Sequence, residues 1–190
     1  MAQIKELKRA YGFDDVAIAP GEITVNPEGV NTSFSLDGHE FDIPFKASAM
    51  DAVVNPSFAG ELDRLGGVAV LNLDGLQTRY ENTEEIYSDI ASKPREEATA
   101  FLQKVYSEPM RDDLVSRRVE EIKASGATCA VSVIPANTKR LAPVVKEAGA
   151  EILVVQSTVT TVRHISKSLR GLIFSELVEN VGLPVLVGNT

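Results

Sequence analysis

The chain has 190 residues, 44% of them hydrophobic and 24% charged, which is the balance of a globular protein with a sizeable core. It has no apolar run of the roughly 18 residues that a membrane helix needs, and its first residues lack the apolar segment of a secretory signal. The formal net charge of −8 disfavours non-specific binding to nucleic acid or to an anionic membrane.

Glycine and proline punctuate the first 42 residues. We expect an irregular N-terminal segment over 1–42, with short strand-like runs such as 15–19 and 32–36. From residue 43 onward, apolar runs alternate with helical segments. Continuous apolar runs separated by helices are typical of parallel strands that are buried on both faces. The sequence therefore predicts five parallel strands, at about 43–47, 68–71, 129–134, 152–155 and 184–187.

The segments between these runs have helical patterns. We expect helices at 56–65, 139–148 and 162–181, the second ending at Gly149. The charged stretch 78–125 predicts two or three solvated amphipathic helices, and a binding surface there is the less favoured interpretation.

Five parallel strands fit either an open doubly wound sheet or part of a barrel. The first run is followed by Ser48-Ala49-Met50-Asp51, without the glycine-rich turn that a dinucleotide-binding sheet needs there. We therefore predict an α/β fold, the N-terminal part of a TIM (β/α)₈ barrel with about five parallel strands and their helices. The first five βα units would span 43–190, with the helical insert at 78–125.

Small polar residues follow every predicted strand, and in a barrel such positions converge on one face. Uncharged hydroxyls and amides can bind ribose hydroxyls and base edges without burying a charge. The same residue types also begin turns and cap helices, and for any single position that structural explanation stays open. The positions are Ser48, Asn72, Asn137, Gln156, Ser157 and Asn189.

The sequence has no motif for a metal site or an activated nucleophile. His39 and His164 are isolated from other metal ligands, and no phosphate-binding loop or serine elbow is present. Cys129 lies in an apolar run, so we expect an inert, buried thiol. A single cysteine also excludes an intrachain disulfide and is typical of a cytoplasmic protein.

Several segments resemble the IMP dehydrogenase/GMP reductase family, in the family's order. The Phe-Asp-Asp segment at 12–25 and the Ser-Ala-Met-Asp segment at 43–54 carry most of the resemblance. A paired-glycine strand entry at 65–72 and the segments 148–165 and 183–190 extend it over nearly the whole chain.

The resemblance implies a ligand, a cofactor and a set of binding residues. The ligand would be a purine nucleoside monophosphate, with Ser48 near its phosphate, Met50 under its base, and Gly188 and Asn189 beside it. The cofactor would be NAD or NADP, near Gln156, Ser157 and Asn72. The resemblance also implies a homotetramer.

The chain departs from the family pattern in three places. Gln156 stands where most members have an aspartate, so the contact with the cofactor ribose would lack a carboxylate. Asn72 stands where a histidine is common. The segment after the second strand is too short for paired CBS domains, so the chain is nearest to the CBS-less group called IMP dehydrogenase-related.

The activity implied by the resemblance is oxidation of IMP to XMP with NAD through a cysteine thioimidate. The alternatives are reduction of GMP to IMP with NADPH, a non-catalytic nucleotide-binding homologue, and, least favoured, an unrelated phosphate-binding barrel enzyme. In the family the catalytic cysteine follows the sixth strand, and the five predicted strands end before it. We therefore expect no catalytic residue in this chain, which would be a fragment that is inactive on its own.

A half-barrel leaves apolar edge strands and an uncovered inner face. We expect the 190-residue chain, expressed alone, to aggregate or to bind hydrophobic dyes. Gel filtration and thermal unfolding test this expectation. A monodisperse monomer that melts cooperatively would contradict the prediction of a barrel fragment.

Overall fold

The computed structural model describes residues 8–157 and 171–188. The chain divides into two compact units, Met1–Asn31 and Thr32–Thr190. No described helix combines the length and apolarity required to cross a membrane.

The first unit has two single 3₁₀ turns, η1 (Phe13–Asp15) and η2 (Pro27–Gly29). Asp15 stabilises η1, because its carboxylate Oδ2 accepts the backbone N–H of Gly12 at 2.9 Å. All of the described residues of this unit are exposed. The strand predicted at 15–19 is wrong, since Asp15 belongs to η1 and residues 16–19 follow it without pairing with a described strand.

The second unit begins with a β-hairpin, β1 (Phe34–Leu36) and β2 (His39–Phe41). Asp37 and Gly38 form its turn, both with positive φ, which matches the twist of a two-residue hairpin. The rings of Phe34 and Phe41 stack with centroids 4.9 Å apart.

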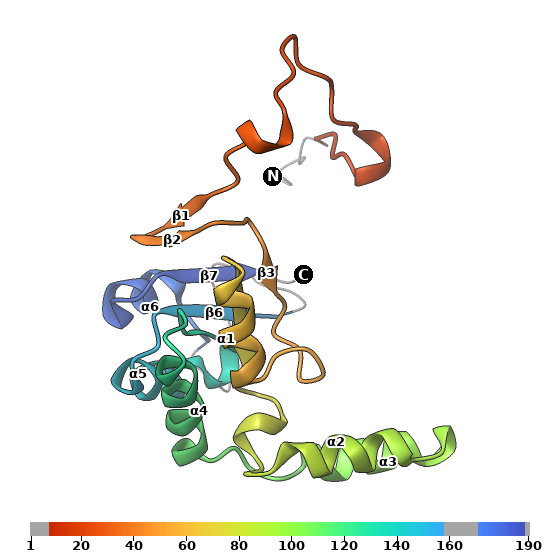
Figure 1. The fold of residues 1–190 in the computed structure, drawn as a ribbon. Coiled ribbons are helices and arrows are strands. Elements are labelled where there is room, and N and C mark those ends of the chain that lie inside the picture. The colour runs from red at the N-terminus through yellow and green to blue at the C-terminus, as the bar shows by residue number, and fades with distance from the viewer. Residues whose placement is uncertain (1–7, 158–170, 189–190) are drawn as a thin grey trace, which may run out of the picture. The chain divides into compact units, whose positions relative to one another are not determined.

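A five-stranded parallel sheet follows, with its described strands in chain order (Figure 1). The predicted apolar runs are confirmed to within three residues at each end. The strands are β3 (Lys46–Ala47), β4 (Val68–Asn72), β5 (Ala130–Val133), β6 (Ile152–Gln156) and β7 (Val185–Gly188).

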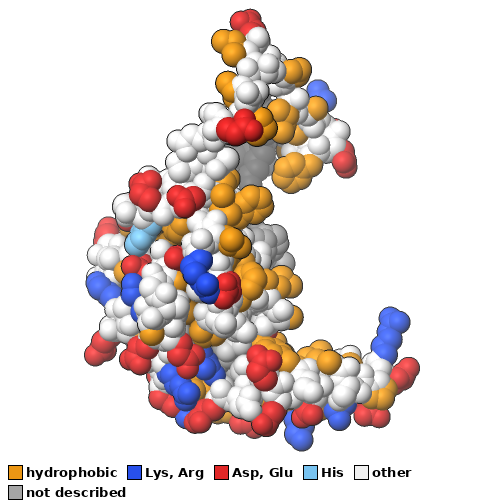
Figure 2. All heavy atoms as spheres, viewed as in Figure 1, with side chains coloured by type: hydrophobic (Ala, Val, Ile, Leu, Met, Phe, Trp, Pro, Cys, Tyr) orange, Lys and Arg blue, Asp and Glu red, His pale blue; other side chains and the backbone are white. Residues whose placement is uncertain are grey.

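Six α-helices lie within the described residues. The charged stretch gives a 3₁₀ turn, η3 (Leu76–Thr78), and then three helices, as predicted, whose acidic and basic side chains are interspersed on the surface (Figure 2). The helices are α1 (Pro56–Arg64), α2 (Thr83–Ser92), α3 (Arg95–Tyr106), α4 (Asp112–Ala124), α5 (Pro135–Ala148) and α6 (Phe174–Val181).

Two helix boundaries differ from the prediction. Helix α5 begins at Pro135 rather than near residue 139, because proline suits the first position of a helix. It ends as predicted, with Gly149 in the left-handed region at φ 97°. The helix predicted at 162–181 is observed as α6, Phe174–Val181; Gly171 and Leu172 are not helical, and residues 158–170 lie outside the described part.

Successive residues of each strand point to opposite faces of the sheet, which creates two apolar layers. Leu71, Val131 and Leu153 pack with the helices in an outer core. Val70, Ala130 and Ile152 form the core of the inner face, against which Phe41 of the hairpin packs. The inner face is therefore apolar over most of its length, and polar residues appear on it where the strands end.

Candidate functional site

Three of the predicted binding residues line one cavity on the inner face of the sheet. This cavity of about 200 Å³ is bordered by Ser48, Gln156 and Gly188, together with apolar side chains of β4, β6 and β7. Lys46 also lines it. Sequence reasoning missed Lys46, because a lysine inside an apolar strand run gives no sign of the face to which it points.

Two more of the residues predicted at the strand ends, Asn72 and Ser157, line a second cavity. Asn72, Gln156 and Ser157 border this space of about 230 Å³, with Asp74 and Ser132. Gln156 lines both cavities, so its amide stands between them.

The parallel register explains why these residues meet. Asn72 pairs with Ser132, and Gln156 pairs with Gly188, each at the carboxyl end of its strand. Their neighbours Leu71 and Val155 point to the opposite face and are fully buried in the outer core. Because Leu71 and Val155 must be buried in the outer core, the residues next to them in each strand face the cavities.

Met50 and Asn189 do not join this group. Met50 is 54% exposed and lines neither of the two cavities. Asn189 lies outside the described residues. The proposed contacts of these two residues with a nucleotide stay predictions.

The amide of Asn72 is oriented by two hydrogen bonds. Its Nδ2 donates to Asp51 Oδ1 at 3.0 Å, and its Oδ1 accepts the backbone N–H of Asp74 at 3.1 Å. A carboxylate can only accept and an N–H can only donate, so the positions of the amide nitrogen and oxygen are determined. One amide hydrogen of Asn72 remains for a further hydrogen bond.

Asp74 caps the helix that follows the neighbouring strand. Its Oδ2 accepts the backbone N–H of Ile134 at 2.7 Å, and its Oδ1 accepts from Asn137 Nδ2. Asn137, expected at the strand end, therefore lies in the first turn of α5 and binds Asp74. Sequence spacing could not reveal this pairing, because the two residues are 63 positions apart.

Cys129 is fully buried, and burial, followed by the nearby Glu151 carboxylate, raises the pKa of its thiol to about 12. A thiol with such a pKa is not a nucleophile at neutral pH. The prediction of a buried thiol is confirmed, and the raised pKa agrees with an inert one. Within the described residues, histidine, cysteine and carboxylate side chains form no group able to hold a metal ion.

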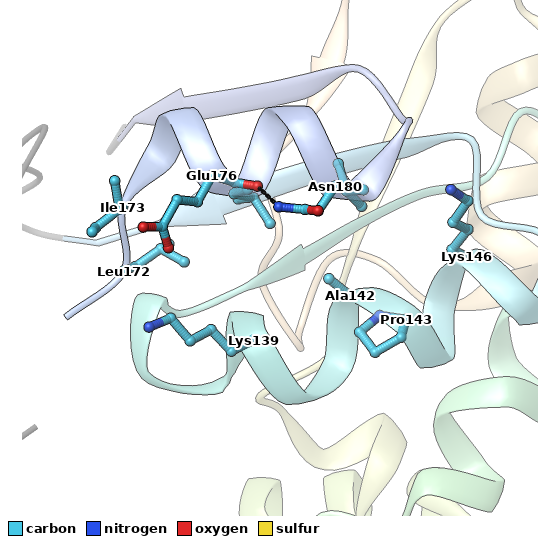
Figure 3. Close-up of a pocket in the computed structure, with 10 residues that line it drawn as sticks. Lys139, Ala142, Pro143, Lys146, Leu172, Ile173, Glu176 and Asn180 are labelled. Atoms are coloured by element: carbon cyan, nitrogen blue, oxygen red, sulfur yellow. Dashed lines mark hydrogen bonds between the residues drawn. The ribbon is translucent and has the colours of Figure 1, made fainter. Parts of the chain in front are cut away.

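A larger cavity of about 500 Å³ lies between α5 and α6, in the helical layer (Figure 3). Lys139 and Lys146 extend from α5, and across the cavity Asn180 donates to the carbonyl of Glu176 at 2.5 Å (Figure 3). The rest of its lining is mostly apolar. We place the candidate site at the strand ends instead, because polar groups from several strands converge there, as they do in barrel enzymes.

Comparison with known proteins identifies the family. A family model described as the IMP dehydrogenase / GMP reductase domain matches residues 10–189. The chain belongs to this family. The match covers both units and all the described strands of the sheet.

Relatives agree with this assignment. Uncharacterized oxidoreductases from Mycolicibacterium smegmatis and Mycobacterium tuberculosis are each 34% identical over 186 residues, which is 95% of this chain and 50% of theirs. An inosine-5′-monophosphate dehydrogenase from Methanocaldococcus jannaschii is 38% identical over 72 residues, which is 38% of this chain and 14% of that protein.

A solved structure supports the fold. The crystal structure of an IMP dehydrogenase/GMP reductase-like protein from Corynebacterium glutamicum is similar with a TM-score of 0.87 and 29% identity, over 98% of this chain and 50% of that one. The chain thus spans about half the length of the two mycobacterial oxidoreductases and of this solved structure. Its fold, the N-terminal part of a barrel, is confirmed.

Asp74→Ala tests the cap that fixes the edge of the second cavity. We expect the free energy of unfolding to fall by about 1–2 kcal/mol, because the first turn of α5 loses a charge-assisted acceptor. Asp89→Ala, an exposed position on α2, is the matched control and should change stability by less than about 0.5 kcal/mol. Equal effects of the two substitutions in urea unfolding would contradict the capping role.

Proposed function

We propose that this chain forms one wall of the active site of a purine-nucleotide oxidoreductase, which oxidises IMP to XMP with NAD. The observation that carries the proposal is the pair of cavities at the strand ends that share Gln156. A hydride-transfer enzyme needs two ligands side by side, and two adjoining cavities meet that need.

The residues lining the first cavity suit a nucleoside monophosphate. Ser48 offers a hydroxyl and Lys46 a cation, and Gly188 leaves room because no atom lies within 4 Å of where its Cβ would be. We assign Ser48, Gly188 and Asn189 to substrate binding, and Met50 to the face of the base. The roles of Asn189 and Met50 rest on the family resemblance alone.

The second cavity suits a nicotinamide cofactor, NAD or NADP, which accepts or supplies the hydride when bound. Gln156, Ser157 and Asn72 present two amides and a hydroxyl toward it. These neutral groups can hold ribose hydroxyls or a carboxamide. Residues of this chain therefore bind and orient the two ligands.

Reduction of GMP to IMP with NADPH is the second candidate. A non-catalytic nucleotide-binding role is the third candidate, and two residues favour it. Gln156 stands where the resemblance implies an aspartate, and Asn72 where it implies a histidine. The proposal also includes a cytoplasmic location and assembly into a homo-oligomer.

Steady-state assays of the full-length protein test the proposal. Turnover of IMP with NAD, followed by nicotinamide absorbance, is the expected result. Turnover of GMP with NADPH and none of IMP would reject the dehydrogenase direction. Tight binding of IMP or GMP without turnover would leave the non-catalytic role, and no binding would contradict every form of the proposal.

Gln156→Asp tests the cofactor contact. A carboxylate makes a charge-assisted hydrogen bond to a ribose hydroxyl, so we expect the Kd for NAD to fall by about fivefold. Gln103→Asp adds the same charge on the exposed side of α3 and should leave the Kd unchanged. Equal Kd values for NAD in the wild type and the Gln156→Asp variant would contradict the assignment of Gln156.

A further inference from the structure

The carboxylate of Asp51, directly after Met50, connects the loop after β3 to three other segments. Its Oδ1 accepts from Asn72 Nδ2 at 3.0 Å, and its Oδ2 accepts from the backbone N–H of Leu76 at 2.8 Å and the hydroxyl of Tyr106 at 2.6 Å. Its backbone carbonyl accepts the hydroxyl of Tyr87 at 2.8 Å. One residue thus contacts the end of β4, η3, α2 and α3.

The two tyrosines belong to the helical hairpin of α2 and α3, which extends away from the sheet (Figure 1). Burial and the hydrogen bond to Asp51 raise the pKa of Tyr106, so its hydroxyl stays protonated and donates at neutral pH. Tyr106 lies in the last turn of α3, where the hairpin returns to the body of the unit.

Asp51 has little freedom to move. A Cβ added at Gly75 would lie 1.7 Å from its Oδ1, so the carboxylate packs directly on the backbone of the loop after β4. Three donors converge on the two carboxylate oxygens of Asp51. An asparagine in its place would point its own N–H group at one or more of these donors, where no hydrogen bond can form. The position therefore needs a carboxylate.

We infer that Asp51 is a positioning residue that couples the α2–α3 hairpin to the cofactor side of the site. The inference rests on the proposed function for the identity of the ligand. Tyr106 and Leu76 fix the carboxylate, the carboxylate fixes the amide of Asn72, and Asn72 lines the cavity that it shares with Gln156 and Ser157. A partner or ligand that moves the hairpin would then change affinity for the cofactor.

Asp51→Asn and Tyr106→Phe in the full-length protein test the coupling, with Tyr11→Phe, an exposed tyrosine of the first unit, as the matched control. We expect Tyr106→Phe to raise the Kd for the nicotinamide cofactor by about fivefold, the loss typical of one hydrogen bond. Asp51→Asn should raise it further. The Kd for the nucleoside monophosphate should change by less than about twofold in either variant.

Two outcomes would overturn the inference. If both variants keep the wild-type cofactor Kd, Asp51 does not position Asn72 for binding. If the two ligands lose affinity equally, the role of Asp51 is structural.

Hydrogen exchange of the ligand-free protein distinguishes failure of the Asp51 coupling from failure of the proposed function. The amide of Asp74, which donates to Asn72 Oδ1, should exchange faster in Tyr106→Phe than in Tyr11→Phe. Faster exchange in a protein that binds neither ligand would reject the proposed function and keep the coupling. Equal exchange rates in the two variants would reject the coupling itself.

Discussion

The register of the parallel strands is the constraint on which the candidate site depends. Apolar side chains of β4, β5 and β6 must face the helices on one side and the inner core on the other. A shift of one residue would exchange the two sets and expose an apolar layer. This burial holds the register. The last inward-facing residues of the strands therefore lie at one edge of the sheet, and Asn72 and Gln156 are among them.

Two carboxylates then hold the loops beyond that edge. Asp51 connects the loop after β3 to the end of β4, and Asp74 connects the loop after β4 to the start of α5. Each accepts hydrogen bonds from backbone N–H groups or amides that would otherwise lack a partner. Asn72 binds both residues, so its orientation depends on the loop after β3 and the loop after β4.

Much of this architecture could be predicted from the sequence. The apolar runs indicated all the described strands of the sheet, and Gly149 marked the end of α5. Polar residues after each run indicated the edge where Ser48, Asn72 and Gln156 lie. Local periodicity and the rule that parallel strands end at a common edge were sufficient for these predictions.

The rest depended on contacts between residues far apart in the chain. Nothing near Asp51 in the sequence indicated that Tyr106, 55 positions away, would donate to it. The sequence pattern predicts the start of α5 too late, because Asn137 closely follows the apolar run of β5 and yet lies in the first turn of the helix. Residues 15–19 had the composition of a strand but have no described strand beside them.

We propose that the two cavities at the strand ends bind the ligands of a purine-nucleotide oxidoreductase. A crystal structure of the full-length protein with a purine nucleoside monophosphate would show whether they do. We expect the nucleotide to lie against Ser48 and Gly188, with Gln156 between it and the second cavity. A nucleotide bound between α5 and α6, away from these residues, would contradict this proposal.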